Sequence, residues 1–439
     1  MQVLLQLKTT INKMDIFAQN NISLLDDPRS DNKIVYLPFS DYAIILKAED
    51  VFELHQCLSY NKTYSSIPKV QTVLSQHAKP IRKVIQTSHN VEGLKSLMLL
   101  PNNKCNFHCS YCYSANGRTN KEININVLEA SLRYFLDSGR AKGERLSITV
   151  LGGGEPLLSW NILKPALEKA ILMIGQRENT CQISLVTNGS ICTDDIIQYC
   201  LIHNISLSVS FDILEDVQNS QRGSWKEVSG NINRFAESGL DIALNTVISN
   251  ENVARMSEMI EHLARFHKKV KKVSFKTLIT KKHFHNIEER REYYQKFIYN
   301  FFKAKSLADK YGIWLTCSYM NTCLCLVDRY CPGKFVVTSE GDISICHTVG
   351  SKHDELYNDF IFGHIDEKTG NVTVNEDMLR NILSFDVTKN DGCTECAARW
   401  HCAGGCYADR FHLSKEEHRA YCKSMNSFLA HYLIYNFKL

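Results

Sequence analysis

The chain has 439 residues, 44% of them hydrophobic, and a formal net charge of +4. This length suffices for two or three domains with their own cores, and the composition is that of an ordinary globular protein. The basic residues are scattered and no apolar run is long enough to span a bilayer, so the sequence predicts no nucleic-acid partner and no membrane partner.

Cysteine is the unusual part of the composition, with 17 residues. No apolar segment at the N-terminus has the form of a secretory signal, so we expect a cytoplasmic protein without a disulfide framework. The cysteines are then better explained as ligands of a metal or an iron–sulfur cluster.

Residues 1–95 are expected to form a small α+β domain. Residues 33–39 and 42–47 have the pattern of a β-hairpin, and helical patterns follow near residues 49–60 and 67–77. Strands followed by helices fit several kinds of small domain, so this pattern alone names no function.

Between residues 96 and 312, apolar strand patterns and amphipathic helical patterns alternate six times, which predicts a parallel α/β sheet. Six units are fewer than the eight that close a full barrel. Thr193 and Asn250 are placed to cap two helices, and Gly239 and Gly312 to end two others. The expected strands are residues 96–100, 146–151, 182–187, 205–211, 241–248 and 271–278.

Three cysteines follow the first expected strand directly, in the spacing Cys105-x3-Cys109-x2-Cys112. Three thiolates on one short loop can hold three irons of a 4Fe–4S cube. The fourth iron is then left open and can bind a small molecule.

Glycines and polar residues stand at the ends of the next three expected strands. The second ends in Leu151-Gly-Gly-Gly-Glu-Pro156, the third in Thr187-Asn188-Gly189 and the fourth in residues 208–212. Glycines let the backbone approach a ligand, and Glu155 adds an anionic acceptor. Each segment also has a plainer explanation as turn chemistry, and the glycine spacing does not fit a Rossmann or P-loop phosphate site.

A second group of cysteines lies toward the C-terminus. The spacing is Cys331-x9-Gly341-x4-Cys346, then Cys393-x2-Cys396-x5-Cys402-x3-Cys406, and then Cys422. Taken alone, these residues could equally close a structural zinc site, because Cys-x2-Cys followed by Cys-x3-Cys can supply four tetrahedral ligands.

The triplet, with Tyr111 before its last cysteine, resembles the signature of the radical S-adenosylmethionine (SAM) enzymes. The C-terminal spacing resembles the SPASM domain that follows it in many of them, which favours clusters over zinc. The resemblance covers residues 96–425. It implies a partial (β/α)6 TIM-like barrel, the radical SAM core, over residues 96–312, a SPASM domain over 313–425 and a C-terminal helix over 426–439.

The resemblance also implies three 4Fe–4S clusters, one that binds SAM on the triplet and two auxiliary ones. Such interleaved ligand sets occur in two-cluster ferredoxins. Cys317 and Cys323 are near enough in sequence to compete with Cys325, so that ligand stays open. The implied first auxiliary set is Cys325, Cys331, Cys346 and Cys406, and the second is Cys393, Cys396, Cys402 and Cys422.

Several residues match positions that contact SAM in the family. Gly153, Gly154 and Glu155 match the loop that holds the methionine ammonium. Asn188 and Ser210 match positions that face the ribose and carboxylate, and Arg222 stands near a usual arginine contact. We expect ligands at the C-terminal ends of the strands, as in other such barrels.

The leading functional hypothesis is a radical SAM/SPASM maturase of a ribosomally made peptide. A 5′-deoxyadenosyl radical would remove hydrogen from the peptide and lead to a carbon–carbon or thioether cross-link or a similar oxidation. Residues 1–95 resemble a leader-peptide recognition element, which would take the leader as an added strand. The expected partners are a precursor peptide with its leader and a reductant such as flavodoxin or ferredoxin.

Two alternatives stay open. A sulfatase maturase, which makes formylglycine, usually has an Asp after the second ligand of the first auxiliary cluster, whereas this chain has His347 there. His347 is a candidate proton acceptor or a hydrogen-bond donor beside a cluster. The other alternative is a non-catalytic iron–sulfur scaffold or electron carrier.

Overall fold

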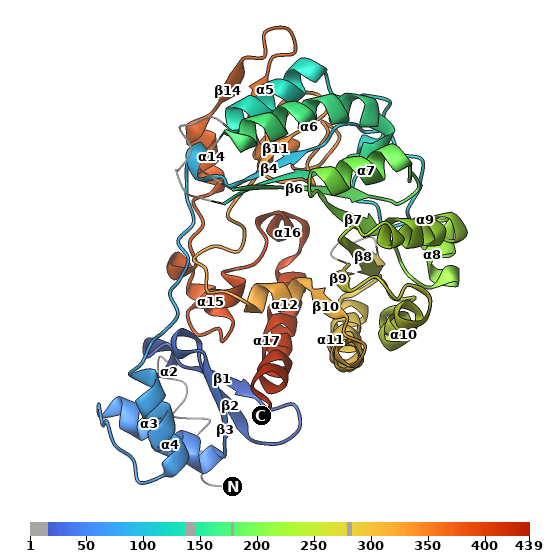
Figure 1. Cartoon of the computed structure of the whole chain (residues 1–439). Coiled ribbons are helices and arrows are strands. Elements are labelled where there is room, and N and C mark those ends of the chain that lie inside the picture. The colour runs from blue at the N-terminus through green and yellow to red at the C-terminus, as the bar shows by residue number, and fades with distance from the viewer. Residues whose placement is uncertain (1–15, 137–144, 177–179, 279–282) are drawn as a thin grey trace.

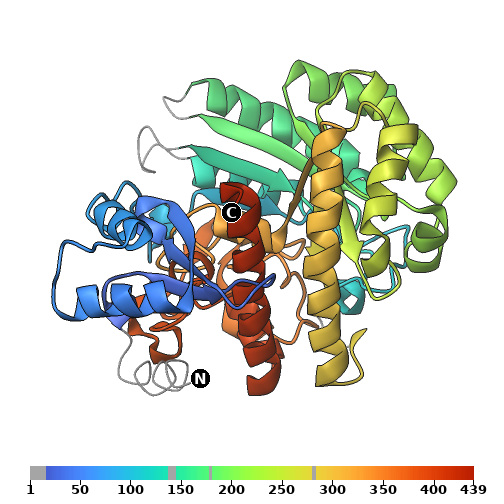
Figure 2. The ribbon, with the colours of Figure 1, turned by 90° about the horizontal axis from the view of Figure 1, so that it is seen from below.

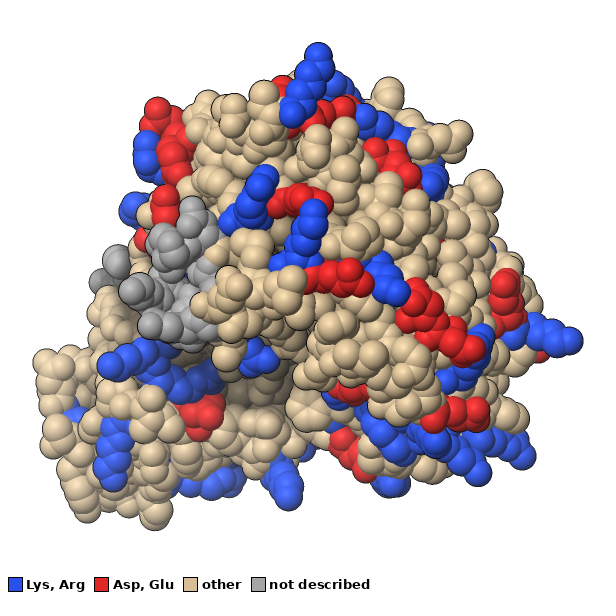
Figure 3. All heavy atoms as spheres, turned by 45° about the horizontal axis from the view of Figure 1, so that its top comes forward, with Lys and Arg blue, Asp and Glu red and all other residues tan. Residues whose placement is uncertain are grey.

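A computed structural model describes residues 16–136, 145–176, 180–278 and 283–439. A small N-terminal unit lies at one end of the molecule and a large curved sheet at the other, with C-terminal helices between them (Figure 1). Among the described helices, none is long and apolar enough to cross a membrane. On the face seen in Figure 3, basic and acidic side chains are interspersed, in line with the small net charge of +4.

The N-terminal unit is an antiparallel sheet covered by helices. Its strands, in the order β1-β2-β3, confirm the expected hairpin as β2 and β3 and add β1, which the sequence analysis missed. Alternate strand residues and one face of each long helix form a separate buried cluster that includes Val35, Leu54 and Val73. The elements are α2 (Ile16–Gln19), β1 (Ser23–Asp26), β2 (Lys33–Leu37), β3 (Tyr42–Leu46), α3 (Ala48–Ser59) and α4 (Pro68–His77).

The large sheet contains the six parallel strands that the alternating pattern predicts, each within two residues of its expected bounds. They are β4 (Ser96–Leu99), β5 (Leu146–Val150), β6 (Cys181–Thr187), β7 (Ser206–Ser210), β8 (Ile242–Ile248) and β9 (Lys272–Thr277). The connecting helices are α5 (Ile125–Leu136), α6 (Trp160–Gly175), α7 (Asp194–Ile202), α8 (Glu215–Gln221), α9 (Trp225–Glu237), α10 (Met256–Phe266) and α11 (Ile287–Lys310).

Five further strands extend this sheet at its two edges, giving the order β10-β9-β8-β7-β6-β5-β4-β11-β12-β13-β14. β10 and β11 are parallel to their neighbours β9 and β4, and β12 to β14 are antiparallel. The barrel therefore stays open. The added strands are β10 (Trp314–Cys317), β11 (Phe335–Val337), β12 (Asp342–Ser344), β13 (Ile361–Ile365) and β14 (Val372–Val374).

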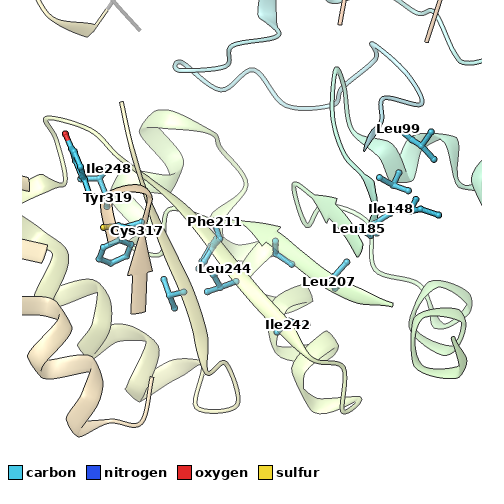
Figure 4. Close-up of a cluster of buried hydrophobic side chains, with 14 of the residues drawn as sticks. Leu99, Ile148, Leu185, Leu207, Phe211, Ile242, Leu244, Ile248, Cys317 and Tyr319 are labelled. Atoms are coloured by element: carbon cyan, nitrogen blue, oxygen red, sulfur yellow. The ribbon is translucent and has the colours of Figure 1, made fainter. Parts of the chain in front are cut away.

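The two faces of the large sheet differ in chemistry because successive strand residues point to opposite faces. The face toward the connecting helices is apolar and buried, as Figure 4 shows for Ile148, Leu185, Leu207 and Leu244. The opposite face, here called the inner face, carries half-buried polar residues in matching register: Ser147, Thr149, Ser184, Ser208, Ser210, Asn245, Ser274 and Lys276.

Three of the four predicted helix ends are confirmed. Thr193 accepts a hydrogen bond from the backbone of Ile196 at the start of α7, and Gly239 and Gly312 follow α9 and α11 with positive φ. The prediction for Asn250 is wrong. A turn over residues 249–252 and a 3-10 segment precede α10, and the Asn250 side chain instead donates to Glu289.

The C-terminal part adds further helices, of which α12, α15, α16 and α17 lie below the large sheet in Figure 1. The last expected helix is longer than predicted, because α17 begins at Lys415 behind a capping box of Ser414 and Glu417, so Cys422 lies within it. α17 lies between the N-terminal unit and α11 (Figure 2). These helices are α12 (Ser318–Cys323), α13 (Tyr357–Phe360), α14 (Glu376–Ile382), α15 (Arg399–Cys402), α16 (Tyr407–His412) and α17 (Lys415–Phe437).

Candidate functional site

The loop after β4, which carries Cys105, Cys109 and Cys112, lies directly against the glycine-rich loop after β5. The backbone of Gly154 donates to the carbonyl of Asn102 at 2.9 Å, and that of Glu155 donates to the carbonyl of Lys104 at 2.8 Å. A Cβ atom on Gly154 would lie 1.8 Å from the Lys104 oxygen. Only glycine therefore permits this close approach of the two loops.

The carboxylate of Glu155 joins the loop after β5 to the end of β6. It accepts hydrogen bonds from the Thr187 hydroxyl at 2.6 Å, the Asn188 backbone at 2.7 Å and the Leu157 backbone at 3.1 Å. The side chain is 2% exposed, and burial raises its pKa although these donors oppose the shift. Glu155 thus stabilises the loop geometry, with its oxygens already engaged by the protein.

Two of the three thiols of the β4 loop have polar neighbours at their sulfur atoms. The Asn188 amide donates to Cys105 Sγ at 3.8 Å, and the guanidinium of Arg118 donates to Cys112 Sγ at 3.2 Å. Burial raises the pKa of Cys109 and Cys112. A bound cluster would reverse that shift, because coordination to a metal deprotonates a thiol.

Tyr111 connects this loop to the end of β7. Its hydroxyl donates to Asp212 Oδ2 at 2.6 Å and accepts from Arg222 Nη1 at 2.9 Å. Burial alone would lower the pKa of Arg222, but Tyr111, Cys109 and Asp212 hold it above its ordinary value. Arg222 is therefore a fixed cation beside Cys109.

The same edge of the sheet retains buried polar atoms with no partner in the protein. Among the described residues these include Asn102 Oδ1, Asn103 Nδ2, Gln221 Nε2 and Arg222 Nε. Ser210, at the end of β7, is half-buried on the inner face beside Asn245. Three thiols, an arginine and several unsatisfied polar atoms supply the donor types that an iron–sulfur cluster with a polar ligand would use.

Three of the four cysteines predicted for the first auxiliary set lie together. Burial, with smaller contributions from Asp409 and from the neighbouring thiols of Cys346 and Cys331, raises the pKa of Cys406 to about 12. Cys325 is exposed, while Cys317 and Cys323 are buried. Cys323 is near Cys317 and Cys402, so the identity of the fourth ligand stays a prediction.

The four cysteines predicted for the second auxiliary set also lie together, around Cys402 on α15. Burial raises the pKa of Cys402, and Cys396, Cys422 and Cys393 add like-charge repulsion. The Asn426 amide donates to Cys396 Sγ at 3.4 Å. In the part of the chain that the structure describes, no group of three or more His, Cys, Asp or Glu residues is arranged to hold a metal ion.

Arg410 lies near thiols of both auxiliary sets. Its guanidinium donates to the Gly404 carbonyl at 2.9 Å through Nε and stacks 3.6 Å from the Phe385 ring centre. Its charge acts on Cys393, Cys402, Cys406 and Cys422.

His347 lies between the β4 loop and the first auxiliary set. Its ring is edge-on to that of Tyr113, with 5.9 Å between centroids. Burial lowers the pKa of His347 to about 3, and the charges of Lys334 and Lys276 contribute to the shift.

Some residues of this site were missed by sequence reasoning. Asp212 belongs to a strand end that the sequence analysis quoted, but nothing singled it out as the partner of Tyr111. No motif marks Arg118 and Arg410, and only the fold brings them near the thiols. The same holds for Lys276, which the fold places on the inner face of the sheet.

Comparison with known proteins agrees with this geometry. The sequence profile of the radical SAM superfamily matches residues 99–263. The uncharacterized protein MJ0907 of Methanocaldococcus jannaschii is 27% identical over 276 residues, which are 59% of this chain and 87% of that protein. The cysteine-type anaerobic sulfatase-maturating enzyme of Clostridium novyi is 22% identical over 351 residues, 71% of this chain and 88% of the relative. The radical SAM cyclopropyl synthase TigE of Paramaledivibacter caminithermalis is 26% identical over 202 residues, 41% of each chain.

Solved structures show the same fold at low sequence identity. The enzyme anSMEcpe with bound AdoMet and the Cp18Cys peptide superposes with a TM-score of 0.60 at 17% identity, covering 77% of this chain and 97% of that one. Streptococcus suis SuiB bound to its precursor peptide SuiA superposes with a TM-score of 0.52 at 15% identity, covering 91% and 97%.

Proposed function

Residues 99–263 match the radical SAM superfamily, and from this premise we propose that the chain is a radical SAM enzyme of the oxidoreductase type and a maturase of a ribosomally made peptide. The observation that supports this most directly is the β4 loop, whose three thiols, fixed against the glycine-rich loop, lie beside unsatisfied buried polar atoms. The modification we propose is an oxidation such as a carbon–carbon or thioether cross-link.

The radical SAM family implies SAM and a 4Fe–4S cluster, which together supply a 5′-deoxyadenosyl radical able to remove a hydrogen atom from a peptide. In our proposal Cys105, Cys109 and Cys112 hold that cluster. Gly153 and Gly154, which pack closely against the β4 loop, would present their backbone to the methionine end of SAM, and Glu155 keeps their loop in place. Asn188, Ser210 and Arg222 line the same edge and orient the polar groups of SAM.

We assign the two C-terminal groups of cysteines to auxiliary clusters. The first would use Cys331, Cys346 and Cys406 with Cys325, Cys323 or Cys317, and the second the group around Cys402. A flavodoxin or ferredoxin would supply electrons, and the free thiols favour a reducing, cytoplasmic setting.

The N-terminal unit is our candidate for recognition of a leader peptide. β3 is an edge strand, and the Lys69 ammonium donates to the outward carbonyl of Ile45 at 3.2 Å. An extended peptide could pair with this edge through backbone hydrogen bonds. Within the inner site, His347 is the candidate proton acceptor, because Tyr113 from the β4 loop contacts its ring.

A sulfatase maturase is the second candidate. The relative from Clostridium novyi favours it, since the match spans 88% of that enzyme. The N-terminal unit and His347 in place of the usual Asp favour the peptide maturase. A scaffold without activity is the third possibility, and it predicts no cleavage of SAM.

The test is anaerobic co-expression of the chain with each short peptide encoded beside its gene, followed by intact-mass spectrometry. We expect one peptide to lose two hydrogens, and fragmentation then locates the new bond. Conversion of Cys to formylglycine in a sulfatase-derived peptide supports the second candidate instead.

The matched control replaces Cys105, Cys109 and Cys112 together with Ala. The mass change must vanish in this variant if the triplet is responsible. Production of 5′-deoxyadenosine without any modified peptide would reject the substrate assignment, and no 5′-deoxyadenosine from the reconstituted chain would favour the scaffold.

A further inference from the structure

Arg118 follows the three cysteines of the β4 loop and folds back across that loop. Its guanidinium donates to Cys112 Sγ at 3.2 Å through Nη2 and to the carbonyl of Phe107 at 3.4 Å through Nη1. The remaining nitrogen, Nε, is buried and has no hydrogen-bond partner among the described residues. Because Phe107 precedes Cys109 and Cys112 follows it, one side chain joins the two parts of the loop on either side of Cys109.

The backbone next to Arg118 packs against the C-terminal part of the chain. Gly117 is buried, and a Cβ atom there would lie 2.7 Å from the Cβ atom of Ser351. Ser351 is also buried, and its backbone donates to the carboxylate of Asp354 at 2.8 Å. This close packing leaves the segment before Arg118 little room to move. The direction from which the guanidinium reaches Cys112 is therefore fixed by the fold.

Arg118 differs from the other cations at this loop because no carboxylate offsets its charge. Lys104 forms an ion pair with Glu122 at 2.8 Å. Arg222 reaches the carboxylate of Asp212 through one tyrosine hydroxyl. In the part of the chain that the structure describes, no ion pair involves Arg118, whose other polar contact is a neutral carbonyl. Arg118 thus keeps an uncompensated positive charge at a cysteine sulfur.

A guanidinium beside a cysteine sulfur stabilises negative charge at that sulfur. In the proposed function the three thiolates hold a 4Fe–4S cluster, and reduction transfers one electron to it from a flavodoxin or ferredoxin, without a proton. The reduced form then carries one negative charge more than the oxidised form, so a neighbouring cation favours reduction. Hydrogen bonds to the sulfurs are among the features that set the reduction potential of such a cluster.

We infer that Arg118 is a positioning residue that holds its charge at Cys112, where it stabilises the anionic cluster and makes that cluster easier to reduce. The inference rests on the proposed function, because it needs a cluster on the triplet. Asn188 does not supply the same effect, since its neutral amide lies 3.8 Å from Cys105 Sγ. A charged donor at shorter distance gives the stronger hydrogen bond.

The test is a redox titration of the full-length, cluster-reconstituted protein without oxygen and without SAM. Dithionite supplies the electrons in the presence of redox mediators, and electron paramagnetic resonance records the reduced clusters at each potential. The signal of interest is the component that is absent from the variant with Cys105, Cys109 and Cys112 replaced by Ala. This measurement needs no turnover.

Arg118→Gln removes the charge and keeps a side chain that can donate a hydrogen bond. The equilibrium constant for reduction of the triplet cluster should fall at least about tenfold, which for one electron is a shift of about 59 mV to lower potential. Arg118→Lys keeps the charge without the planar fork, and its shift should be less than about half as large. Arg133→Gln is the matched control, because it removes the same charge at an exposed position on α5 and should leave the potential unchanged.

Equal potentials in the unaltered protein and in Arg118→Gln overturn the inference. A shift in Arg118→Lys as large as that in Arg118→Gln overturns it too, because the charge is then not the cause. Iron and sulfide analysis covers variants that fail to hold the cluster. Loss of the triplet cluster from Arg118→Gln alone supports the inference, since Lys still supplies the charge, whereas loss from both variants overturns it.

Two further measurements, of 5′-deoxyadenosine and of peptide mass, separate this inference from the proposed function. A shifted potential without 5′-deoxyadenosine from SAM and without a modified peptide keeps the role of Arg118 and rejects the radical reaction. A modified peptide with an unshifted potential rejects only the role of Arg118. Absence of any triplet-dependent signal from the unaltered protein rejects both.

Discussion

At the scale of single residues, the most important feature of this site is the glycine that lets two loops pack closely. Gly154 sits where a Cβ atom would lie 1.8 Å from the Lys104 oxygen and 2.3 Å from Asn102 Oδ1. Both neighbours belong to the segment that leads into Cys105. The glycine therefore sets the position of the thiols as well as that of its own loop.

We expect Gly154→Ala to lower the rate of 5′-deoxyadenosine formation at least about tenfold, because the β4 loop must move to admit the methyl group. Steady-state formation from SAM by the reconstituted variant is the measurement. Gly175→Ala is the matched control, since a Cβ there meets nothing within 4 Å. Equal rates for both variants would contradict this reading of the loop.

Sequence reasoning located residues with motif spacing and missed those without it. The thiols, Glu155 and Asn188 follow strand ends and could be found from pattern alone. Arg118 reaches Cys112 Sγ and Arg410 lies near the thiols of both auxiliary sets, each from a position with ordinary spacing, and nothing local distinguishes them. The fourth ligand of the set with Cys331, Cys346 and Cys406 also stays open, because spacing does not decide between the three cysteines at positions 317, 323 and 325.

At the scale of elements, α9 and α10 are joined through a buried histidine. His267 ends α10 and is 1% exposed, and its Nδ1 lies 2.8 Å from Asn233 Oδ1 on α9. Burial lowers the pKa of His267 to about 4, with a smaller contribution from His262. The neutral ring is therefore the form that fits between the helices.

This predicts a loss of stability in acid. The folded-state pKa of about 4 lies below the ordinary value of 6.5, so the contribution of His267 is complete above pH 6.5 and is lost as the pH falls toward 4. Between pH 7 and pH 5 the free energy of unfolding should fall by about 2 kcal/mol from this residue. Urea unfolding of the cluster-free chain at both pH values measures it, and His267→Gln should remove about that much of the pH dependence.

The elements themselves were predictable where they are long and periodic. The six central strands and the hairpin follow from alternation of apolar residues, and Thr193 caps α7 as expected. The short strands β10 to β14 span three to five residues and give too little pattern to be recognised. The prediction that Asn250 caps a helix was wrong because Asn is favoured in turns as well as at helix N-termini.

At the scale of the whole molecule, a polar network joins the N-terminal unit to the C-terminal part. The Tyr36 hydroxyl lies 2.9 Å from His401 Nε2, and His401 Nδ1 lies 2.9 Å from the carbonyl of Cys325. Arg82 donates to the carbonyl of Leu324 at 2.8 Å. The proposed peptide-binding unit is thus fixed to the segment that precedes Cys331.

Tyr36→Phe should loosen this attachment by about 1 kcal/mol, the worth of one buried hydrogen bond. Hydrogen–deuterium exchange should then speed up in β1 to β3, while the amides of β5 to β8 keep their rates. Lys33→Met is the control, because Lys33 lies on the same strand with an exposed ion pair to Asp26. Unchanged exchange in the N-terminal strands would show that packing alone holds the unit.

The path of α17 has a consequence for biosynthesis. This helix holds Cys422 and also packs on β1, β3 and α11, yet it follows every other proposed ligand along the chain. During translation, neither the second thiol group nor the attachment of the N-terminal unit can be completed until this helix has left the ribosome. Completion of the second thiol group and of that docking would then be late steps, and a product that stops before residue 415 would lack Cys422 and the contacts of α17 with β1 and β3.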